Sequence, residues 1–438
     1  MQVRPKTGVR TAAKLLLGNL VLLVVLLELA GNVVCLARTG RPAWARREAS
    51  AAAGKPHEGL TGDFPVRLHP YLGYVYRPTS TFAPGTMYKG FPLEAQRSNN
   101  FGFLSPHDYP VRPTPRREVI VGLFGGSVAT SLALRETGAG VLARRLASVP
   151  AFAGRPILVV PFAQPGYKQP QQLLALSYFL ALGQDFDLVI NVDGLNEAVL
   201  PRVFNPPGPS GEGPMDVTMP AGTFYAPLLA VAARGVGEEA DEVPYLRSRA
   251  ARLGAEAVRA RTGAVYFVKT LSASLAERRY QAALGEAKKS PGGGAVALFR
   301  ENLSEEALDE KTVRVWADSS RAMQGLLEKR GVPYVHVLQP NVFFPVVRRH
   351  PTDRVPDDVR PLFVQSVGAS YPRMQRAGKA LTAEGVLFLD ATGLFDAEPV
   401  ERAYLDDCCH LTDGGADVFL ARVGEFAAGR LQSGSRKR

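Results

Sequence analysis

Five short runs of β-branched and aromatic residues lie between residues 118 and 391, and each ends at polar or turn-forming residues. The first three runs are spaced by about 30 residues, and helix-like segments such as QQLLALSYFLAL fill the gaps. Strands and helices that alternate at this spacing are typical of βαβ units, which build a parallel sheet. The runs are EVIVGLF from Glu118, ILVVPFA from Ile157, DLVINVD from Asp187, YVHVLQP from Tyr334 and VLFLDA from Val386. The sequence therefore predicts an α/β fold around a parallel sheet.

A second constraint is the apolar run Leu15 to Leu36, which has 22 residues and a single charge, Glu28. At about 1.5 Å per residue, such a helix spans the roughly 30 Å hydrocarbon core of a bilayer. We predict a transmembrane anchor at 15–36 after a short basic cytoplasmic N-terminus at 1–14, followed by a linker at 37–60. A cleaved signal peptide is the alternative, but the run exceeds the usual apolar length and no A-x-A site follows it.

Two residues of the predicted anchor need an interpretation. Glu28 either contacts a partner helix or lies near the outer membrane interface, and the sequence leaves both open. Cys35 lacks a convincing lipobox and is interpreted as an apolar membrane residue. Basic residues flank the run on both sides, so the positive-inside rule hardly chooses an orientation.

The net charge of +11 could suggest nucleic-acid binding, but its distribution argues against it. Residues 1–60 carry +6, residues 430–438 carry +4, and the rest of the chain carries about +1. A nearly neutral body offers no basic stripe that could follow a phosphate backbone. We therefore predict no nucleic-acid partner, and three cysteines are too few for a disulfide scaffold or a four-cysteine zinc module.

The chain between anchor and C-terminus divides by composition. Residues 61–117 contain nine prolines, which forbid long helices and predict a loop-rich extension. Residues 118–430 hold the predicted sheet domain, interrupted at about 204–319 by a Pro/Gly-rich loop and helical stretches that read as an insertion or cap. Residues 431–438 form a basic tail.

Candidate site residues follow the predicted strands, because the ligand crevice of an open parallel sheet lies beyond the carboxyl ends of its strands. Ser127 follows Gly125-Gly126 at the first strand end, Gly166 follows the second, and Asn196 follows the third. Near the C-terminus, Asp407 and His410 are three residues apart and could meet within one turn. A serine hydroxyl needs a base to attack at neutral pH, and histidine is the usual one.

This order of Ser, Gly, Asn and Asp-x-x-His resembles the SGNH (GDSL-type) hydrolases, over about residues 118–428. The resemblance implies a three-layer α/β/α domain of the flavodoxin-like kind and a bacterial, membrane-anchored member. It also implies roles: Ser127 as nucleophile, Gly166 and Asn196 in the oxyanion hole with the Ser127 N–H, His410 as base and Asp407 as the residue that orients it. No cofactor and no metal ion are expected.

Two departures from the family pattern matter. Gly-Gly-Ser stands where the family has Gly-Asp-Ser, but the serine keeps its place. Cys408 and Cys409 lie between the paired residues; metal binding or redox control is conceivable, yet small buried apolar residues are the preferred reading. An α/β-hydrolase is the rival fold, but its acid normally lies far upstream of the histidine.

The extension also echoes membrane-tethered members of the family, through His69-Pro70-Tyr71-Leu72-Gly73-Tyr74 and Ser98-Asn99-Asn100-Phe101-Gly102-Phe103. Asn99, Asn100 and Tyr74 could face the substrate, although an Asn-rich structural turn is preferred. The remaining histidines show no ligand spacing and are interpreted as incidental; they are His57, His107, His336 and His350.

The sequence thus predicts a serine esterase that acts on ester-linked, O-acetyl-like acyl groups of a glycan or lipid in the cell envelope. The resemblance implies that the protein is located in the inner (cytoplasmic) membrane, with a single span and an extracytoplasmic catalytic domain. An SGNH-type O-acyltransferase is one alternative, because a sugar hydroxyl can resolve an acyl-serine in place of water. A non-catalytic glycan-binding module is the other. The oligomeric state is not predicted.

Overall fold

A computed structural model describes residues 7–45, 66–81, 97–112, 114, 118–203, 216–222, 262–289, 301–351 and 355–435, with scattered positions between 225 and 260. The chain forms two compact units, residues 64–228 with 297–438, and residues 1–63 with 229–296. Most of the predicted linker, its His57, the Pro/Gly-rich loop after Phe204 and the last three residues of the tail lie outside the described residues.

The larger unit is built on a five-stranded sheet in which every neighbouring pair is parallel. Its strands occupy the five predicted runs, in the spatial order β4-β3-β5-β6-β7. They are β3 (Val119–Gly125), β4 (Ile157–Ala163), β5 (Leu188–Asp193), β6 (Tyr334–Leu338) and β7 (Leu387–Asp390). All residues of β3, β5 and β6 are buried, because helices cover the sheet on both faces. The predicted α/β fold with a parallel sheet is confirmed.

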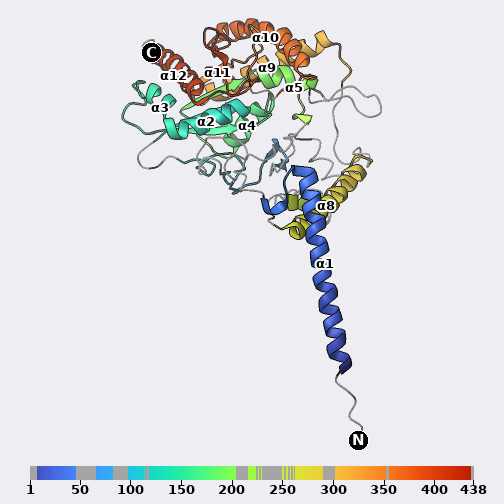
Figure 1. The fold of residues 1–438 in the computed structure, drawn as a ribbon. Coiled ribbons are helices and arrows are strands. Elements are labelled where there is room, and N and C mark those ends of the chain that lie inside the picture. Colours follow the sequence, from blue (N-terminus) through green and yellow to red (C-terminus); the bar gives the residue numbers. More distant parts are fainter. Residues whose placement is uncertain are drawn as a thin grey trace. The chain divides into compact units, whose positions relative to one another are not determined.

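Helices form the two outer layers (Figure 1). One layer contains α2 (Ser127–Ala139), α3 (Val141–Leu146) and α12 (Asp413–Ser435), which pack on one another and on the sheet. The other contains α4 (Gln171–Ala181), α5 (Leu195–Val203), α9 (Glu305–Glu328) and α10 (Arg360–Ala383). The short α11 (Val400–Ala403) leads into the loop before α12. The three-layer α/β/α arrangement is therefore confirmed.

The order of the strands in the sheet indicates where a ligand site is expected. The chain passes from β3 to β4 on one side and then returns to β5 on the other side of β3, so the order reverses between β3 and β5. The register sets Gly125 beside Ala163 and Val192, and the loops that follow these three strands therefore start at one edge. Such a switch point is where open α/β sheets bind ligands.

The predicted loop-rich extension is part of this same unit. It contains an antiparallel hairpin, β1 (Val66–His69) and β2 (Gly73–Tyr76), whose Leu72 and Tyr74 join the main hydrophobic core. Tyr109 continues this packing, with its ring stacked on Phe162 of β4 at a centroid distance of 4.5 Å. The extension thus supports the sheet instead of standing apart from it.

The predicted insertion ends too late in the sequence. Its proposed end at about residue 319 falls inside α9, whose Trp316 is fully buried in the main core. The segment that clusters with the N-terminus is instead 229–296. The sequence signal missed this boundary because α9 is charged on its outer face and resembles the preceding Ala/Arg/Glu-rich helical stretch.

The smaller unit contains the predicted anchor. Helix α1 runs from Thr7 to Thr39, and its section Lys14–Arg38, which contains an 18-residue stretch of mean hydropathy 2.6, is long and apolar enough to cross a membrane. It is followed by a short 3-10 helix, η1 (Ala43–Ala45), and packs against α8 (Gly263–Lys289) (Figure 1).

Candidate active site

Ser127 is placed by a sharp turn between β3 and α2. Gly125 has a φ of 146°, which favours glycine, and a Cβ atom there would lie 2.2 Å from the carbonyl oxygen of Val192. Gly126 then caps α2 and Ser127 is the first helical residue. Its backbone N–H is among the first four of the helix, which have no intrahelical acceptor. The turn therefore presents the Ser127 hydroxyl at a helix N-terminus, where negative charge is stabilised.

The structure brings His410 to this serine from the other end of the chain. The distance from His410 Nε2 to Ser127 Oγ is 2.9 Å, and His410 Nδ1 lies 2.6 Å from Asp406 Oδ2. A carboxylate can only accept, so Nδ1 carries the proton and Nε2 accepts from the serine hydroxyl. Asp406 is almost fully buried, whereas Ser127 and His410 are only half-buried. The three side chains form a hydrogen-bonded Ser-His-Asp row that is open at the serine end.

The predicted pairing of Asp407 with His410 is wrong, because the carboxylate that contacts the imidazole belongs to Asp406. The prediction assumed a helical turn with partners three residues apart, but residues 405–409 form a non-helical loop. The loop is closed by a bridge between Tyr404 and Leu411 and by the Leu405 N–H donating to the His410 carbonyl at 2.7 Å.

The side chain of Asp406 itself shapes this loop. Its Oδ1 accepts the backbone N–H groups of the three residues Cys408, Cys409 and His410, at 3.1, 3.0 and 3.2 Å. These bonds fix the orientation of the carboxylate, which leaves Oδ2 for the imidazole. The chain must curl around the carboxylate to make them, and this brings the fourth residue on, His410, to its side.

Asp407 points to a different partner. Its Oδ2 accepts from Arg360 Nη1 at 2.7 Å and its Oδ1 accepts the Val355 N–H at 3.1 Å. Arg360 also donates to the Arg348 carbonyl at 2.8 Å, and its guanidinium lies over the ring of Phe343. Both charged groups are buried. This ion pair ties the loop with His410 to α10.

The other two predicted site residues lie at the same sheet edge. Asn196 is in the first turn of α5, and its Nδ2 donates to the Tyr167 carbonyl at 2.8 Å. A Cβ atom on Gly126 would lie 2.2 Å from that Nδ2, so the Asn196 amide sits directly beside the turn that carries Ser127. Gly166 precedes Tyr167 with a φ of 76°, a backbone conformation that favours glycine.

The loop-rich extension is hydrogen-bonded to the loop that contains Gly166. Tyr74 donates to the Pro165 carbonyl at 2.7 Å, and the Tyr167 hydroxyl donates to the Tyr74 carbonyl at 2.6 Å. Asn99 and Asn100 bond to backbone groups within their own turn, for example at 3.0 Å from Asn99 Oδ1 to the Phe103 N–H. The preferred reading of these asparagines as a structural turn agrees with this geometry.

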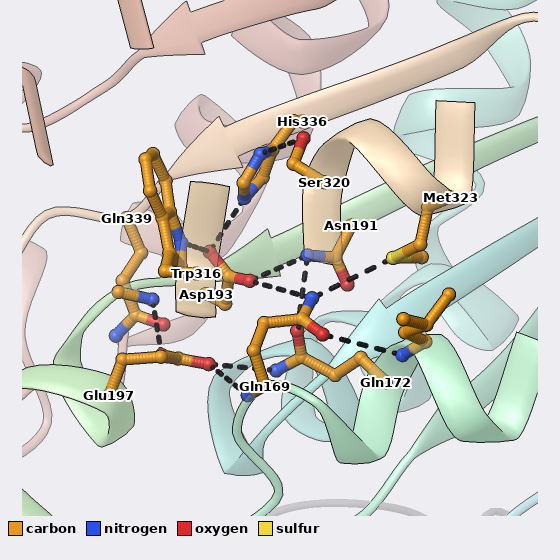
Figure 2. A network of polar contacts seen from close by, with 12 residues as sticks. Gln169, Gln172, Asn191, Asp193, Glu197, Trp316, Ser320, Met323, His336 and Gln339 are labelled. Carbon is orange, nitrogen blue, oxygen red and sulfur yellow. Dashed lines mark hydrogen bonds and ion pairs between the residues drawn. The ribbon is translucent and has the colours of Figure 1, made fainter. Parts of the chain in front are cut away.

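A buried polar network lies beneath this edge (Figure 2). It centres on Asp193 at the end of β5, whose Oδ1 accepts from Trp316 Nε1 at 2.7 Å and whose Oδ2 accepts from Asn191 Nδ2 at 2.6 Å. Glu197 accepts the Gly194 and Gln169 N–H groups, both at 2.8 Å. The network joins the loop after β4 to the loop after β5 and so fixes the positions of Gly166 and Asn196.

His336 belongs to this network, and the prediction that it is incidental is wrong. Its Nε2 lies 2.8 Å from Asp193 Oδ1 and its Nδ1 lies 2.8 Å from Ser320 Oγ (Figure 2). This repeats the Ser-His-Asp connectivity, but the exposed fractions of Ser320, His336 and Asp193 are 0%, 0% and 2%. No substrate reaches a serine at that depth, so this second set has a structural role. The sequence showed only a short, mostly apolar run, YVHVL, with no sign of the partners of its histidine.

Burial shifts the pKa of two groups: Glu197 in the network, and Lys168, which precedes the network residue Gln169 in the chain. Burial and the nearby Asp193 raise the pKa of Glu197 to about 8, so this carboxyl favours the neutral form at neutral pH. Burial lowers the pKa of Lys168 to about 8, against the attraction of Glu197 and Asp216. Sequence reasoning missed both residues, because each lies one or two positions from a predicted one and only the packing shows it to be buried.

Cys408 and Cys409 are thiols whose sulfur atoms lie 3.0 Å apart. Cys409 is buried and Cys408 half-buried, and the hydrogen bond with Cys408 together with burial raises the pKa of the Cys409 thiol. A raised thiol pKa makes Cys409 a poor nucleophile and a poor metal ligand. The preferred reading as small packing residues agrees with this environment.

Comparison with known proteins adds little at the sequence level: no protein-family model and no curated protein matches the chain. Among solved structures, a GDSL-like lipase from Bacteroides thetaiotaomicron is similar at 9% identity, with a TM-score of 0.34, over 73% of this chain and 92% of that one. A lipase/acylhydrolase from Enterococcus faecalis is similar at 12% identity, with a TM-score of 0.35, over 71% of this chain and 96% of that one. Likeness at this level says nothing about activity.

Proposed function

We propose that this protein is an SGNH-type serine esterase that removes ester-linked acyl groups, such as O-acetyl groups, from a glycan or lipid of the cell envelope. One observation carries the proposal: the Ser127, His410 and Asp406 row, with heavy-atom distances of 2.9 and 2.6 Å, half-buried at its serine end. Both distances are within hydrogen-bond reach for a nucleophile, its base and the group that orients the base. The row lies at the switch point of the sheet.

The proposed reaction assigns each step of ester cleavage to a member of this row. His410 Nε2 takes the Ser127 proton as Oγ attacks the acyl carbonyl carbon, and Asp406 stabilises the imidazolium that forms. The imidazolium then gives its proton to the leaving alkoxide, and an acyl-serine remains. Water attacks this ester with His410 as base again, which releases the carboxylic acid and restores the serine.

Negative charge on the tetrahedral oxygen needs donors, and the loops that follow β3, β4 and β5 offer three candidates. They are the Ser127 N–H at the start of α2, the Gly166 N–H and the Asn196 amide. Asn196 has two amide N–H bonds, and the one that donates to the Tyr167 carbonyl fixes the orientation of the other. Loss of a single such donor typically lowers turnover by about 10² to 10³.

Covalent trapping tests the proposed function. Brief incubation with activated esters of increasing acyl length, followed by acid quenching and mass spectrometry, should show an added acyl mass on the peptide that contains Ser127. The longest acyl group that labels this peptide reports the size of the acyl pocket. Acylation at other residues alone, or at Ser127 to the same extent in acid-unfolded protein, would contradict a built active site.

We further propose that α1 crosses the cytoplasmic membrane once, with the residues after it on the extracytoplasmic side. Its apolar section Lys14–Arg38 supports the span. The direction rests on the resemblance to membrane-anchored SGNH hydrolases, because basic residues flank the run on both sides. A reporter that is active only in the cytoplasm should be silent when fused after residue 438. The same reporter fused before residue 1 should be active, and a bright C-terminal fusion would refute the orientation.

A further inference from the structure

We infer that α8 is a second membrane-binding element, whose N-terminal end enters the bilayer beside α1 and whose exposed apolar stripe contacts lipid. The inference rests on the proposed span of α1 and is independent of the esterase activity. It starts from the one acidic residue in the apolar part of α1, Glu28, and from what that residue binds.

Both carboxylate oxygens of Glu28 accept N–H groups from the start of α8. Oε1 lies 2.7 Å from the Gly263 nitrogen, and Oε2 lies 2.8 Å from the Ala264 nitrogen. Asn32, one turn further along α1, also donates to Oε1 at 2.9 Å. Glu28 therefore caps the N-terminus of α8, where the helix leaves N–H groups without intrahelical acceptors. Of the two readings of Glu28 that the sequence left open, the partner helix agrees with these contacts.

The two backbones also touch, because both helices have a glycine at the crossing. A Cβ atom on Gly31 would lie 1.7 Å from the Gly263 carbonyl oxygen, and one on Gly263 would lie 2.2 Å from the Glu28 carbonyl oxygen. Tyr266, in the first turn of α8, packs with Cys35 in a small buried cluster. These contacts fix where along α1 the second helix begins.

That position lies within the bilayer if α1 spans it. Glu28 is 13 residues after Leu15, or about 20 Å along the helix axis, and the hydrocarbon core is about 30 Å thick. The residues from Leu15 to Leu27 alone are too few to span, so the core must extend past Glu28. The capped end of α8 is then roughly 10 Å inside the boundary nearer residue 38. The cap satisfies helix N–H groups that would otherwise be bare there and offsets part of the cost of burying the carboxylate.

The outward face of α8 suits the same environment. Val265, Val268, Leu271 and Leu275 have exposed fractions of 48%, 49%, 50% and 52%, and at 100° per residue they fall within an arc of about 120°. This lipid stripe begins beside Glu28 and continues the exposed apolar surface of α1, where Leu23 and Leu29 are 52% and 61% exposed. The exposed Arg278 and Arg279 follow the stripe by one turn, where anionic headgroups would meet them.

Lipid photolabelling of the full-length chain tests the inference. A benzophenone amino acid replaces Leu271 in the lipid stripe, Glu277 on the opposite exposed face, or Leu23 in α1. Each variant is reconstituted into phosphatidylethanolamine–phosphatidylglycerol vesicles that contain an acyl-chain-labelled lipid. We expect strong labelling at 271 and 23 and several-fold weaker labelling at 277.

Each other outcome overturns a defined part of the inference. Equal labelling at 271 and 277, or a cross-linked dimer at 271 in place of a lipid adduct, refutes a lipid-facing stripe. Absence of lipid labelling from the probe at position 23 refutes the span of α1, and with it the proposed depth of α8 in the bilayer. None of these results depends on esterase activity, which trapping at Ser127 reports separately.

Two glycines of α1 provide a matched test of the docking. With the probe at position 265, Gly31→Leu should reduce lipid labelling several-fold, because the larger side chain forces α8 away from Glu28. Gly18→Leu should leave it unchanged, since no atom lies within 4 Å of a Cβ at that position in the described structure. Unchanged labelling in Gly31→Leu would show that contact with α1 does not set the depth of α8.

Discussion

Ser127→Ala is expected to lower ester hydrolysis by about 10⁴-fold or more, because the remaining groups can bind the substrate but cannot form an acyl-enzyme. The measurement is kcat/KM with a short-chain aryl ester for the wild-type and variant proteins. The variant should also resist labelling by a fluorophosphonate probe. Equal labelling of variant and wild type would show that Ser127 is not the nucleophile.

Folding provides the control for this variant. The Ser127 side chain is half-buried and its hydroxyl bonds to His410, so alanine removes one hydrogen bond of about 1 kcal/mol. The melting temperature should therefore stay within a few degrees of the wild-type value. Ser131 lies one turn further along α2, and its hydroxyl donates to the Ser127 carbonyl. Ser131→Ala is a matched change that should retain most of the activity.

Asp406→Asn is expected to lower turnover by about 10⁴-fold, and Asp407→Asn far less. The reason is local geometry. Three backbone N–H groups hold one Asp406 oxygen, so an asparagine would keep its amide oxygen there and turn its NH₂ toward His410 Nδ1. The imidazole would then carry its proton on Nε2 and could not accept the proton of Ser127.

Asp407→Asn should instead show its effect in stability. It leaves the buried Arg360 guanidinium without its charge partner, and breaking a buried ion pair typically costs about 3–5 kcal/mol. Chemical denaturation at neutral pH should record this loss, while the remaining folded protein keeps most of its turnover. We thus expect different phenotypes from the two neighbouring carboxylates: Asp406→Asn lowers kcat, and Asp407→Asn lowers the free energy of unfolding.

A double variant distinguishes coupled from independent effects. If Asp406 acts through His410, the pair Asp406→Asn with His410→Ala should be little worse than His410→Ala alone. Turnover losses that multiply would mean separate roles. A larger turnover loss in Asp407→Asn than in Asp406→Asn would restore the pairing that the sequence suggests and refute the loop geometry.

The sheet was predictable because its signal is local. Fully buried parallel strands appear as short apolar runs, and the spacing of the runs shows the crossovers between them. The turn at Gly125-Gly126-Ser127 was equally predictable, since a close approach of two backbone segments generally requires glycine. The end of the insertion could not be predicted, because a helix that packs on the sheet can have the same composition as one that does not.

The candidate site likewise contains residues that the sequence predicted and one pairing that it did not. Ser127, Asn196 and His410 were predicted from sequence, because the first two follow predicted strands of a parallel sheet and the C-terminal motif is distinctive. The choice between Asp406 and Asp407 does not follow, since adjacent carboxylates outside a helix point in different directions and only their partners decide which one meets the imidazole. Those partners, three loop N–H groups for Asp406 and Arg360 for Asp407, are set by the path of the loop and by α10.

Sequence by itself thus determined the elements, their order along the chain and the types of the reactive groups. Tertiary structure decided every pairing between distant residues, including His336 with Asp193 and Glu28 with the first turn of α8. The physical reason is range. Periodicity, turn chemistry and helix length depend on residues a few positions apart, whereas a hydrogen bond between residues 143 or 235 positions apart forms only where the packed chain brings the two residues together.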